Sequence, residues 1–208
     1  MGLYSSGTSV ASGGSVVLGN GSVTRSKLTG TAVPGIVPLG TYTVSAGSYY
    51  SIDNIFTSTY SQYTIYFNNL TYAASGRPFL KLIDTAGTIV ASSIYWNSPF
   101  SHDEGDGSFT NGGLAGNTGT KTQWWMAYRY PYQQSGYEFS GYFTIINPYQ
   151  ANNTSMHGFN LTPTPAQVQY TISQGYIFNT TQYRGISFSQ DSGNITGGTI
   201  TVYAHYAA

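Results

Sequence analysis

The stretch SIDNIFTSTYSQYTIYFNNL, residues 51–70, decides the fold. Its second half alternates apolar and polar residues, so Ile65 and Phe67 share one face of a strand at Tyr63–Asn68. The strand ends at Asn68 and Asn69, because asparagine readily adopts turn conformations. One face of this strand can therefore enter a core while the other faces water. The first half supplies further apolar residues for the same core: Ile52, Ile55 and Phe56.

The rest of the chain repeats this pattern of short strands separated by glycine, asparagine and proline. No segment keeps an apolar period of 3.6 residues over three turns, which excludes a mainly helical fold. The pattern predicts an all-β antiparallel sandwich of jelly-roll type. The expected strands are Gly40–Ser45, Tyr63–Asn68, Phe79–Asp84, Thr88–Tyr95, Lys121–Tyr130, Tyr137–Ile146, Ser155–Leu161, Gln167–Ser173, Gln182–Ser189 and Thr199–Tyr206.

The last of these strands shows the clearest alternation. Apolar residues at every second position predict one face turned into the core, and the residues between them predict an outer face. A long loop, residues 96–120, is expected between the strands in the middle of the chain. The inward set of the last strand is Ile200, Val202, Ala204 and Tyr206, and the outward set is Thr201, Tyr203 and His205.

The composition limits the function. Charged residues make up 7% of the 208 residues, with seven Lys and Arg against seven Asp and Glu. A surface that binds phosphates needs clustered Lys and Arg, so nucleic-acid binding is excluded. No apolar run approaches the roughly 18 residues needed to span a bilayer, so no membrane insertion is expected. Aromatic residues make up 16% of the chain and cysteine is absent. So much aromatic surface with so little charge favours a homotrimer, in which subunit contacts hide apolar area.

Residues 1–40 differ from the remainder, because they are rich in small residues and poor in large apolar ones. Such a stretch cannot build its own core, and neighbouring chains would have to order it. The sequence therefore predicts two parts, an extended N-terminal anchoring arm at residues 1–40 and a sandwich head at residues 41–208. The apolar residues expected to anchor the arm are Val16, Val17, Leu18, Ile36, Val37 and Leu39.

Two motifs resemble a known class of proteins. The segment DNIFTSTY, residues 53–60, followed by Tyr63 and Ile65 and then by Leu80, Leu82 and Gly87, resembles the β-sandwich domains of tailed-bacteriophage virion surface proteins. The chain end from Arg184 to Tyr203 is similar to the closing hairpin of those domains, and LGNGSVTRSKLTG, residues 18–30, resembles repeats of phage fibre arms.

The resemblance implies a structural phage protein located in the virion. The first expectation is a tail fibre whose head binds a glycan of the host-cell surface. The alternative is a capsid decoration or head-fibre protein that its N-terminal arm holds on the shell. Other virion proteins, of the tail or of the capsid, are the implied partners.

Candidate sites for chemistry are few. His102 and Glu104 with the distant His157 have the outline of a two-histidine, one-carboxylate iron site, but His102 falls in a glycine-rich acidic loop rather than on a strand. Asp103, Glu104 and Asp106 could supply oxygens to calcium, although a solvated acidic loop accounts for them better. No facing pair of carboxylates and no nucleophile elbow is recognisable. Neither enzyme activity nor a cofactor or metal is expected.

Aromatic residues near the long loop are the remaining candidates. Flat rings beside Asn, Gln and Ser side chains suit stacking on sugars. Trp124, Met126 and Tyr128 share one face of an expected strand, so they are assigned to the core. The candidates for glycan binding are Trp96, Tyr130 and Tyr132.

Overall fold

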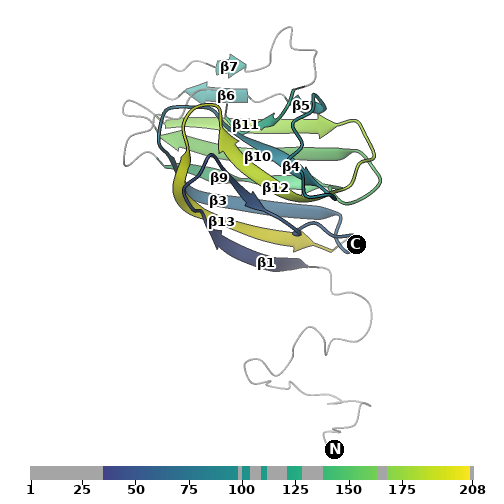
Figure 1. The fold of residues 1–208 in the computed structure, drawn as a ribbon. Coiled ribbons are helices and arrows are strands. Elements are labelled where there is room, and N and C mark those ends of the chain that lie inside the picture. The colour runs from purple at the N-terminus through teal and green to yellow at the C-terminus, as the bar shows by residue number, and fades with distance from the viewer. Residues whose placement is uncertain are drawn as a thin grey trace, which may run out of the picture. The chain divides into compact units, whose positions relative to one another are not determined.

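A computed structural model describes residues 35–97, 100–103, 109–111, 121–127, 138–163 and 168–206. For Asn97 and for residues 100–103 and 109–111 it describes the backbone alone. Across these ranges the chain forms antiparallel strands joined by turns, without a helix, and the strands pack as two sheets (Figure 1). The fold predicted from the sequence, an all-β antiparallel sandwich, is thereby confirmed.

The larger sheet has the strand order β1-β13-β3-β9-β10-β11-β6-β7, and β5 also pairs with β11. The first and last strands of the fold are neighbours in it, since β1 pairs with β13 along its length. On its other side β13 pairs with β3, and the paired residues of these two strands lie more than 120 residues apart in sequence. The bounds are β1 Ile36–Thr43, β3 Gln62–Tyr72, β5 Tyr95–Asn97, β6 Phe100–Asp103, β7 Phe109–Asn111, β9 Phe139–Ile146, β10 Thr154–Pro163, β11 Val168–Ile177 and β13 Ile195–His205.

The smaller sheet has the order β2-β12-β4-β8 and lies in front of the larger one in Figure 1. The chain crosses from one sheet to the other each time it enters or leaves β2, β4, β8 and β12, while β5 to β7 and β9 to β11 follow one another within the larger sheet. The two sheets therefore cannot separate into independent halves. The bounds are β2 Tyr49–Ile52, β4 Pro78–Asp84, β8 Trp124–Trp125 and β12 Tyr183–Gln190.

The core lies between the sheets and is rich in aromatic rings. Phe67 of β3 stacks on Phe139 and Phe143 of β9, with ring centroids 4.9 and 5.1 Å apart. Trp124 is fully buried and meets Tyr95 edge to face at 5.4 Å. The predicted burial of the opening stretch is confirmed, because Ile52, Ile55, Phe56, Ile65 and Phe67 all lie in this core.

Several predictions for the last strand and the tryptophan segment are also confirmed. Ile200, Val202 and Ala204 are fully buried, while Tyr206 lies just past β13 and is half-buried. Trp124 and Met126 belong to the core as expected. Tyr128, Tyr130 and Tyr132 lie outside the described residues, as do Val16, Val17, Leu18, Glu104 and Asp106.

Other predicted elements differ from the structure. The compact unit begins at Pro34 and β1 at Ile36, so the boundary predicted after residue 40 falls inside a strand. Ile36, Val37 and Leu39, assigned to an anchoring arm, are residues of β1. The predicted strand Thr88–Tyr95 is largely wrong, because Ile89 makes one isolated bridge with Ile83 and regular pairing begins only at Tyr95. Lys121–Tyr130 was predicted as one long strand, whereas β8 comprises two residues.

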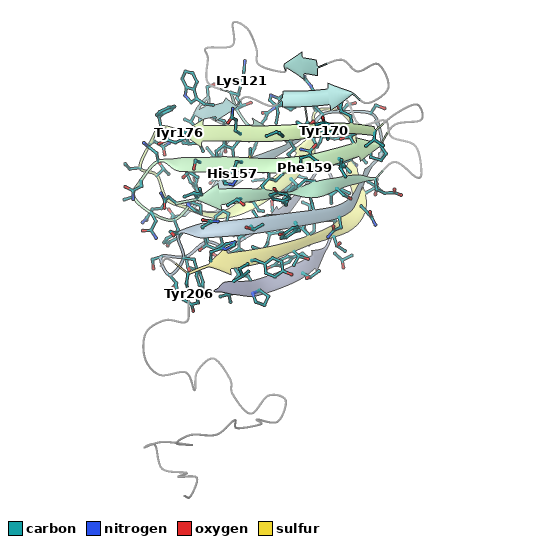
Figure 2. All side chains as sticks on the ribbon, turned by 180° about the vertical axis from the view of Figure 1, so that it is seen from behind. Lys121, His157, Phe159, Tyr170, Tyr176 and Tyr206 are labelled. Atoms are coloured by element: carbon teal, nitrogen blue, oxygen red, sulfur yellow. The ribbon has the colours of Figure 1, made fainter. Side chains whose placement is uncertain are left out.

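The larger sheet turns one face away from the core. Among the described residues no helix is long and apolar enough to cross a membrane. Figure 2 views this outer face directly, with His157 and Phe159 on β10 and Tyr170 and Tyr176 on β11. Its outward positions on the six strands from β1 to β11 carry no Lys, Arg, Asp or Glu.

Candidate functional site

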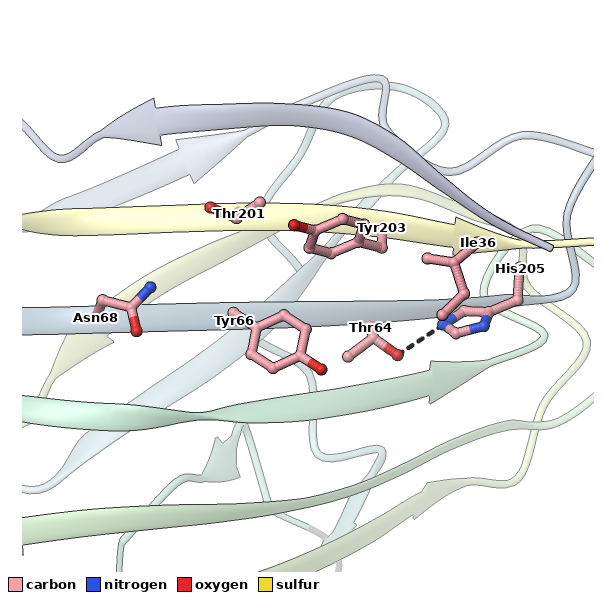
Figure 3. A pocket seen from close by; sticks show the side chains of 7 residues that line it. All are labelled: Ile36, Thr64, Tyr66, Asn68, Thr201, Tyr203 and His205. Atoms are coloured by element: carbon pink, nitrogen blue, oxygen red, sulfur yellow. Dashed lines mark hydrogen bonds between the residues drawn. The ribbon is translucent and has the colours of Figure 1, made fainter. Parts of the chain in front are cut away.

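A groove of about 310 Å³ lies on this outer face, over β1, β13 and β3 (Figure 3). It exists because alternate residues of a strand point to the same side and because β13 and β3 are hydrogen-bonded neighbours. The register places Thr201 opposite Tyr66 and Tyr203 opposite Thr64. The lining residues are Ile36 of β1, Thr201, Tyr203 and His205 of β13, and Thr64, Tyr66 and Asn68 of β3.

Two tyrosine rings form the apolar part of the groove. Tyr66 is 42% exposed and meets Tyr203 edge to face, with centroids 5.7 Å apart. On its other side Tyr66 meets Tyr142 of β9 at 5.8 Å. Each ring thus packs against a neighbouring ring, which lowers the side-chain entropy that a ligand would have to remove on binding.

The polar part of the groove consists of hydroxyls, an amide and one imidazole. His205 Nε2 and Thr64 Oγ1 are hydrogen-bonded at 2.7 Å, and Thr64 Oγ1 also lies 3.4 Å from Thr144 Oγ1. The hydroxyls therefore hold the imidazole in place from below. Thr201 Oγ1 lies 3.1 Å from Thr41 Oγ1, and Asn68 is exposed. The groove thus presents an amide, hydroxyls and an imidazole to solvent, all of which can donate or accept hydrogen bonds.

The charged side chains whose contacts are described lie elsewhere. Arg184 and Asp53 form a two-bonded ion pair beside the smaller sheet, and Arg77 pairs with Asp191 at 3.0 Å. The Arg184 guanidinium holds the pKa of Asp53 below its ordinary value, mainly through its hydrogen bonds. Since none of the groove residues is Lys, Arg, Asp or Glu, the groove has no counter-ion for a charged ligand.

Trp96, a candidate from the sequence, lies far from this groove on the same face. It is 36% exposed and stands opposite Tyr176 of β11, so β9, β10 and β11 separate it from β3. Its ring meets the Phe178 ring edge to face, with centroids 5.8 Å apart. The Phe178 ring centroid in turn lies 4.4 Å from that of Tyr176. The carbonyl of Trp96 accepts a hydrogen bond from the buried Trp124 indole at 3.1 Å. Its other predicted partners, Tyr130 and Tyr132, fall outside the described residues.

The two histidines considered for an iron site are paired with different parts of β11, and Glu104 lies outside the described residues. His102 pairs with Tyr170 in the backbone ladder, while His157 pairs with Gln174, four residues further along β11 and on its other side. Within the described ranges, no group of three His, Asp or Glu side chains lies close enough to hold a metal ion.

The groove itself was missed by sequence reasoning. Tyr203 was predicted to face outward, as was the face of the Tyr63–Asn68 strand opposite to Ile65 and Phe67, to which Tyr66 belongs, and both predictions are confirmed. What the sequence does not contain is a local signal that β13 lies beside β3. The available hint of an aromatic site was an outward tyrosine on each of the two strands.

Comparisons with protein families and with curated proteins gave no match. No protein-family model matches the chain, and no curated protein is significantly similar to it in sequence.

Proposed function

We propose that this chain is a non-enzymatic phage virion protein whose sandwich head binds a neutral glycan in the groove between β13 and β3. The observation that carries the proposal is the groove's make-up: two fixed tyrosine rings beside an amide, hydroxyls and an imidazole, with no charged residue among them. The groove volume of about 310 Å³ is at the small end of ligand sites, which suits one sugar unit.

The chemistry of a sugar fits this lining. One face of a pyranose ring carries C–H groups that pack on an aromatic ring, and its edge carries hydroxyls that need hydrogen-bond partners. Tyr66 and Tyr203 provide the rings, while Asn68, Thr201 and His205 provide partners at the edge. A sugar acid or phosphorylated sugar would be disfavoured, because its charge would lose water without gaining a counter-ion.

The virion role rests on the resemblance of residues 53–60 and of the chain end to phage surface domains. The strand order β1-β13-β3-β9 against β2-β12-β4-β8 supports the jelly-roll assignment within the sandwich class. A homotrimer would display three grooves, and linked weak sites bind a polyvalent surface far more tightly than one site does. Light scattering at micromolar concentration tests the trimer, which a monodisperse monomer would contradict.

The binding test uses a panel of neutral and acidic glycans immobilised on a surface, with the purified chain as the soluble probe. We expect retention by neutral glycans and not by their sialylated or uronic counterparts. Tyr203→Ala and Asn68→Ala should each weaken binding about five- to tenfold, the equivalent of about 1 to 1.4 kcal/mol. Tyr49→Ala is the matched control, because Tyr49 is 56% exposed on β2 of the other sheet.

Two results would count against the proposal. Equal losses for Tyr203→Ala and Tyr49→Ala would show that binding is not in the groove. Absence of binding to every glycan, by a normally folded chain, would favour the alternative role as a capsid decoration protein.

A further inference from the structure

The two groove tyrosines begin a longer row of aromatic rings. The row, defined as Tyr203, Tyr66, Tyr142, Phe159 and Tyr170, has one ring on each of five neighbouring strands: β13, β3, β9, β10 and β11. Backbone register aligns its centre, since Tyr66 is paired with Tyr142 and Tyr142 with Phe159. Figure 2 shows Phe159 and Tyr170 on the same outer face of the sheet.

Three of the four neighbouring ring pairs along the row have similar centroid distances. Ring centroids are 5.7 Å apart for Tyr203 and Tyr66, 5.8 Å for Tyr66 and Tyr142, and 6.1 Å for Phe159 and Tyr170. The spacing follows from the sheet, in which strands lie about 4.8 Å apart, close to the length of one pyranose unit in an extended glycan. Each strand therefore offers one ring per sugar unit.

Polar groups border one flank of the row, as they border the groove. Thr144 is opposite His157, and His157 is opposite Gln174, which places three neutral polar residues side by side on one flank. His157 and Gln174 are exposed. On the other flank Ser140 stands opposite Leu161. The outward positions of β9, β10 and β11 carry no Lys, Arg, Asp or Glu, so the neutral character of the groove continues along the row.

We propose that the aromatic row extends the groove into a binding track for a linear neutral oligosaccharide that crosses the strands, with roughly one sugar unit per strand. This inference rests on the proposed function, since the groove takes the first unit. The Tyr66 ring contacts both Tyr203 in the groove and Tyr142 in the rest of the row. One ligand can therefore occupy the groove and the row together. The chain thus recognises the backbone of a glycan, and not its terminal sugar alone.

Single-stranded nucleic acid is the other extended ligand that stacks on aromatic rings of a sheet. Its phosphates require Lys or Arg along the groove, and the track has none at its outward positions. A second copy of the chain would also cover the rings, but it would leave the exposed amide and imidazole groups along the flank with fewer partners than sugar hydroxyls provide.

The test measures affinity by calorimetry against ligand length. The probes are neutral β-1,4-linked oligomers of glucose and of N-acetylglucosamine, from one to six units, and a thymidine oligonucleotide of similar length. Affinity should rise several-fold with each unit up to about five units and then level off. In Phe159→Ala, which removes the fourth ring of the row, the pentamer should bind no more tightly than the trimer does. Tyr142→Ala is the second track variant, and Tyr49→Ala on the other sheet is the control for an exposed ring.

The outcomes separate this inference from the proposed function. If a single sugar unit binds as tightly as the pentamer, and binding falls in Tyr203→Ala alone, the track is overturned and the groove proposal stands. No binding to any oligomer by the folded chain overturns both. If the oligonucleotide binds more tightly than the sugars, the row binds nucleic acid. If the protein forms a dimer that the Phe159→Ala substitution dissociates, the row is an interface between two copies of the chain.

Discussion

At the scale of single residues, the segment Asp53–Phe56 is held in place where the chain leaves β2 for β3. Asp53 accepts two hydrogen bonds from Arg184, at 2.8 and 2.5 Å, and a third from the backbone N–H of Asn54. Asn54 has a φ of 56°, a left-handed conformation that asparagine tolerates better than most residues. The backbone N–H groups of Ile55 and Phe56 then donate to the carbonyl of Arg184. One arginine therefore anchors the whole segment through its side chain and its backbone.

Removing the Asp53 carboxylate should change how stability depends on pH. Its pKa lies below the ordinary value near 3.8, so the folded state binds the proton less readily than the unfolded state. The contribution of the pair is thus present above that ordinary value and is lost as pH falls through the folded pKa. In Asp53→Asn the melting midpoint at pH 7 should fall by about 1 to 3 °C, since the pair is partly exposed.

Melting curves of both proteins from pH 7 down to pH 2.5 check this prediction. The two midpoints should converge at the acid end, and salt should narrow their difference at neutral pH. A constant difference across the whole range would mean that the carboxylate charge plays no part.

At the scale of elements, the close approach of β9 and β10 depends on the buried Gly158. A Cβ at Gly158 of β10 would overlap the carbonyl oxygen of Tyr142 and a ring carbon of Phe143, both on β9. The backbone of β9 or β10 would have to move to admit it. Since β9 and β10 carry the middle of the aromatic row, their spacing matters for the proposed track as well as for stability.

Gly158→Ala should therefore lower the free energy of unfolding by about 2 kcal/mol or more, because overpacking against backbone cannot be relieved by a rotamer change. Gly197→Ala is the matched control in β13, where the nearest atom to the new Cβ is Thr71 Oγ1 at 3.2 Å. Urea unfolding of the two variants measures the difference. Equal losses would show that the strand contact at Gly158 is not tight.

Elements with strong alternation could be predicted from the sequence, and their pairing could not. Ile65 and Phe67 of β3 and Ile200 and Val202 of β13 were placed correctly because period 2 is a local signal. The groove depends on the register between these two strands, which lie about 130 residues apart and share no local signal. Trp96 drew attention as an isolated tryptophan near a loop, yet it lies at the other end of the sheet.

The segment Thr88–Tyr95 shows a different limit of sequence reasoning. Its apolar residues predicted a strand, but its hydrogen bonds go to β4 at single points, as when Val90 N–H donates to the Leu82 carbonyl. The Tyr95 hydroxyl accepts from Leu82 N–H and donates to the Val90 carbonyl, which holds the segment without a ladder. Burial raises the pKa of Tyr95, in keeping with its place in the core. Side-chain bonds of this kind leave no periodic pattern in the sequence.

At the scale of the whole molecule, the ends of the described chain meet. Ile36 pairs with His205, and the backbone N–H of Tyr206 donates to the carbonyl of Gly35 at 3.3 Å. β1 is therefore part of the sandwich, although the sequence assigned most of it to an arm. Its removal would open the edge of β13 and take Ile36 from the groove.

Two truncations test the position of the boundary. A chain that starts at residue 35 should melt cooperatively and retain glycan binding, because every strand remains. A chain that starts at residue 44 lacks β1, and it should melt at a lower temperature and aggregate more readily through the exposed strand edge. Calorimetry compares the melting temperatures of the two chains, and size-exclusion chromatography compares their aggregation. Identical melting of the two chains would show that β1 adds nothing to the sandwich.

The position of β1 also determines how the molecule bears mechanical tension. In the described sheet β1 is bonded along one side only, to β13, and β13 carries three groove residues. Tension between Gly35 and a ligand in the groove is transmitted through the β1–β13 ladder and bypasses the aromatic core. A pull across the strands would peel β1 away one pair at a time from Ile36, whereas a pull along them would load all the pairs at once. The grip on a ligand would therefore last longest when the pull runs along the strands.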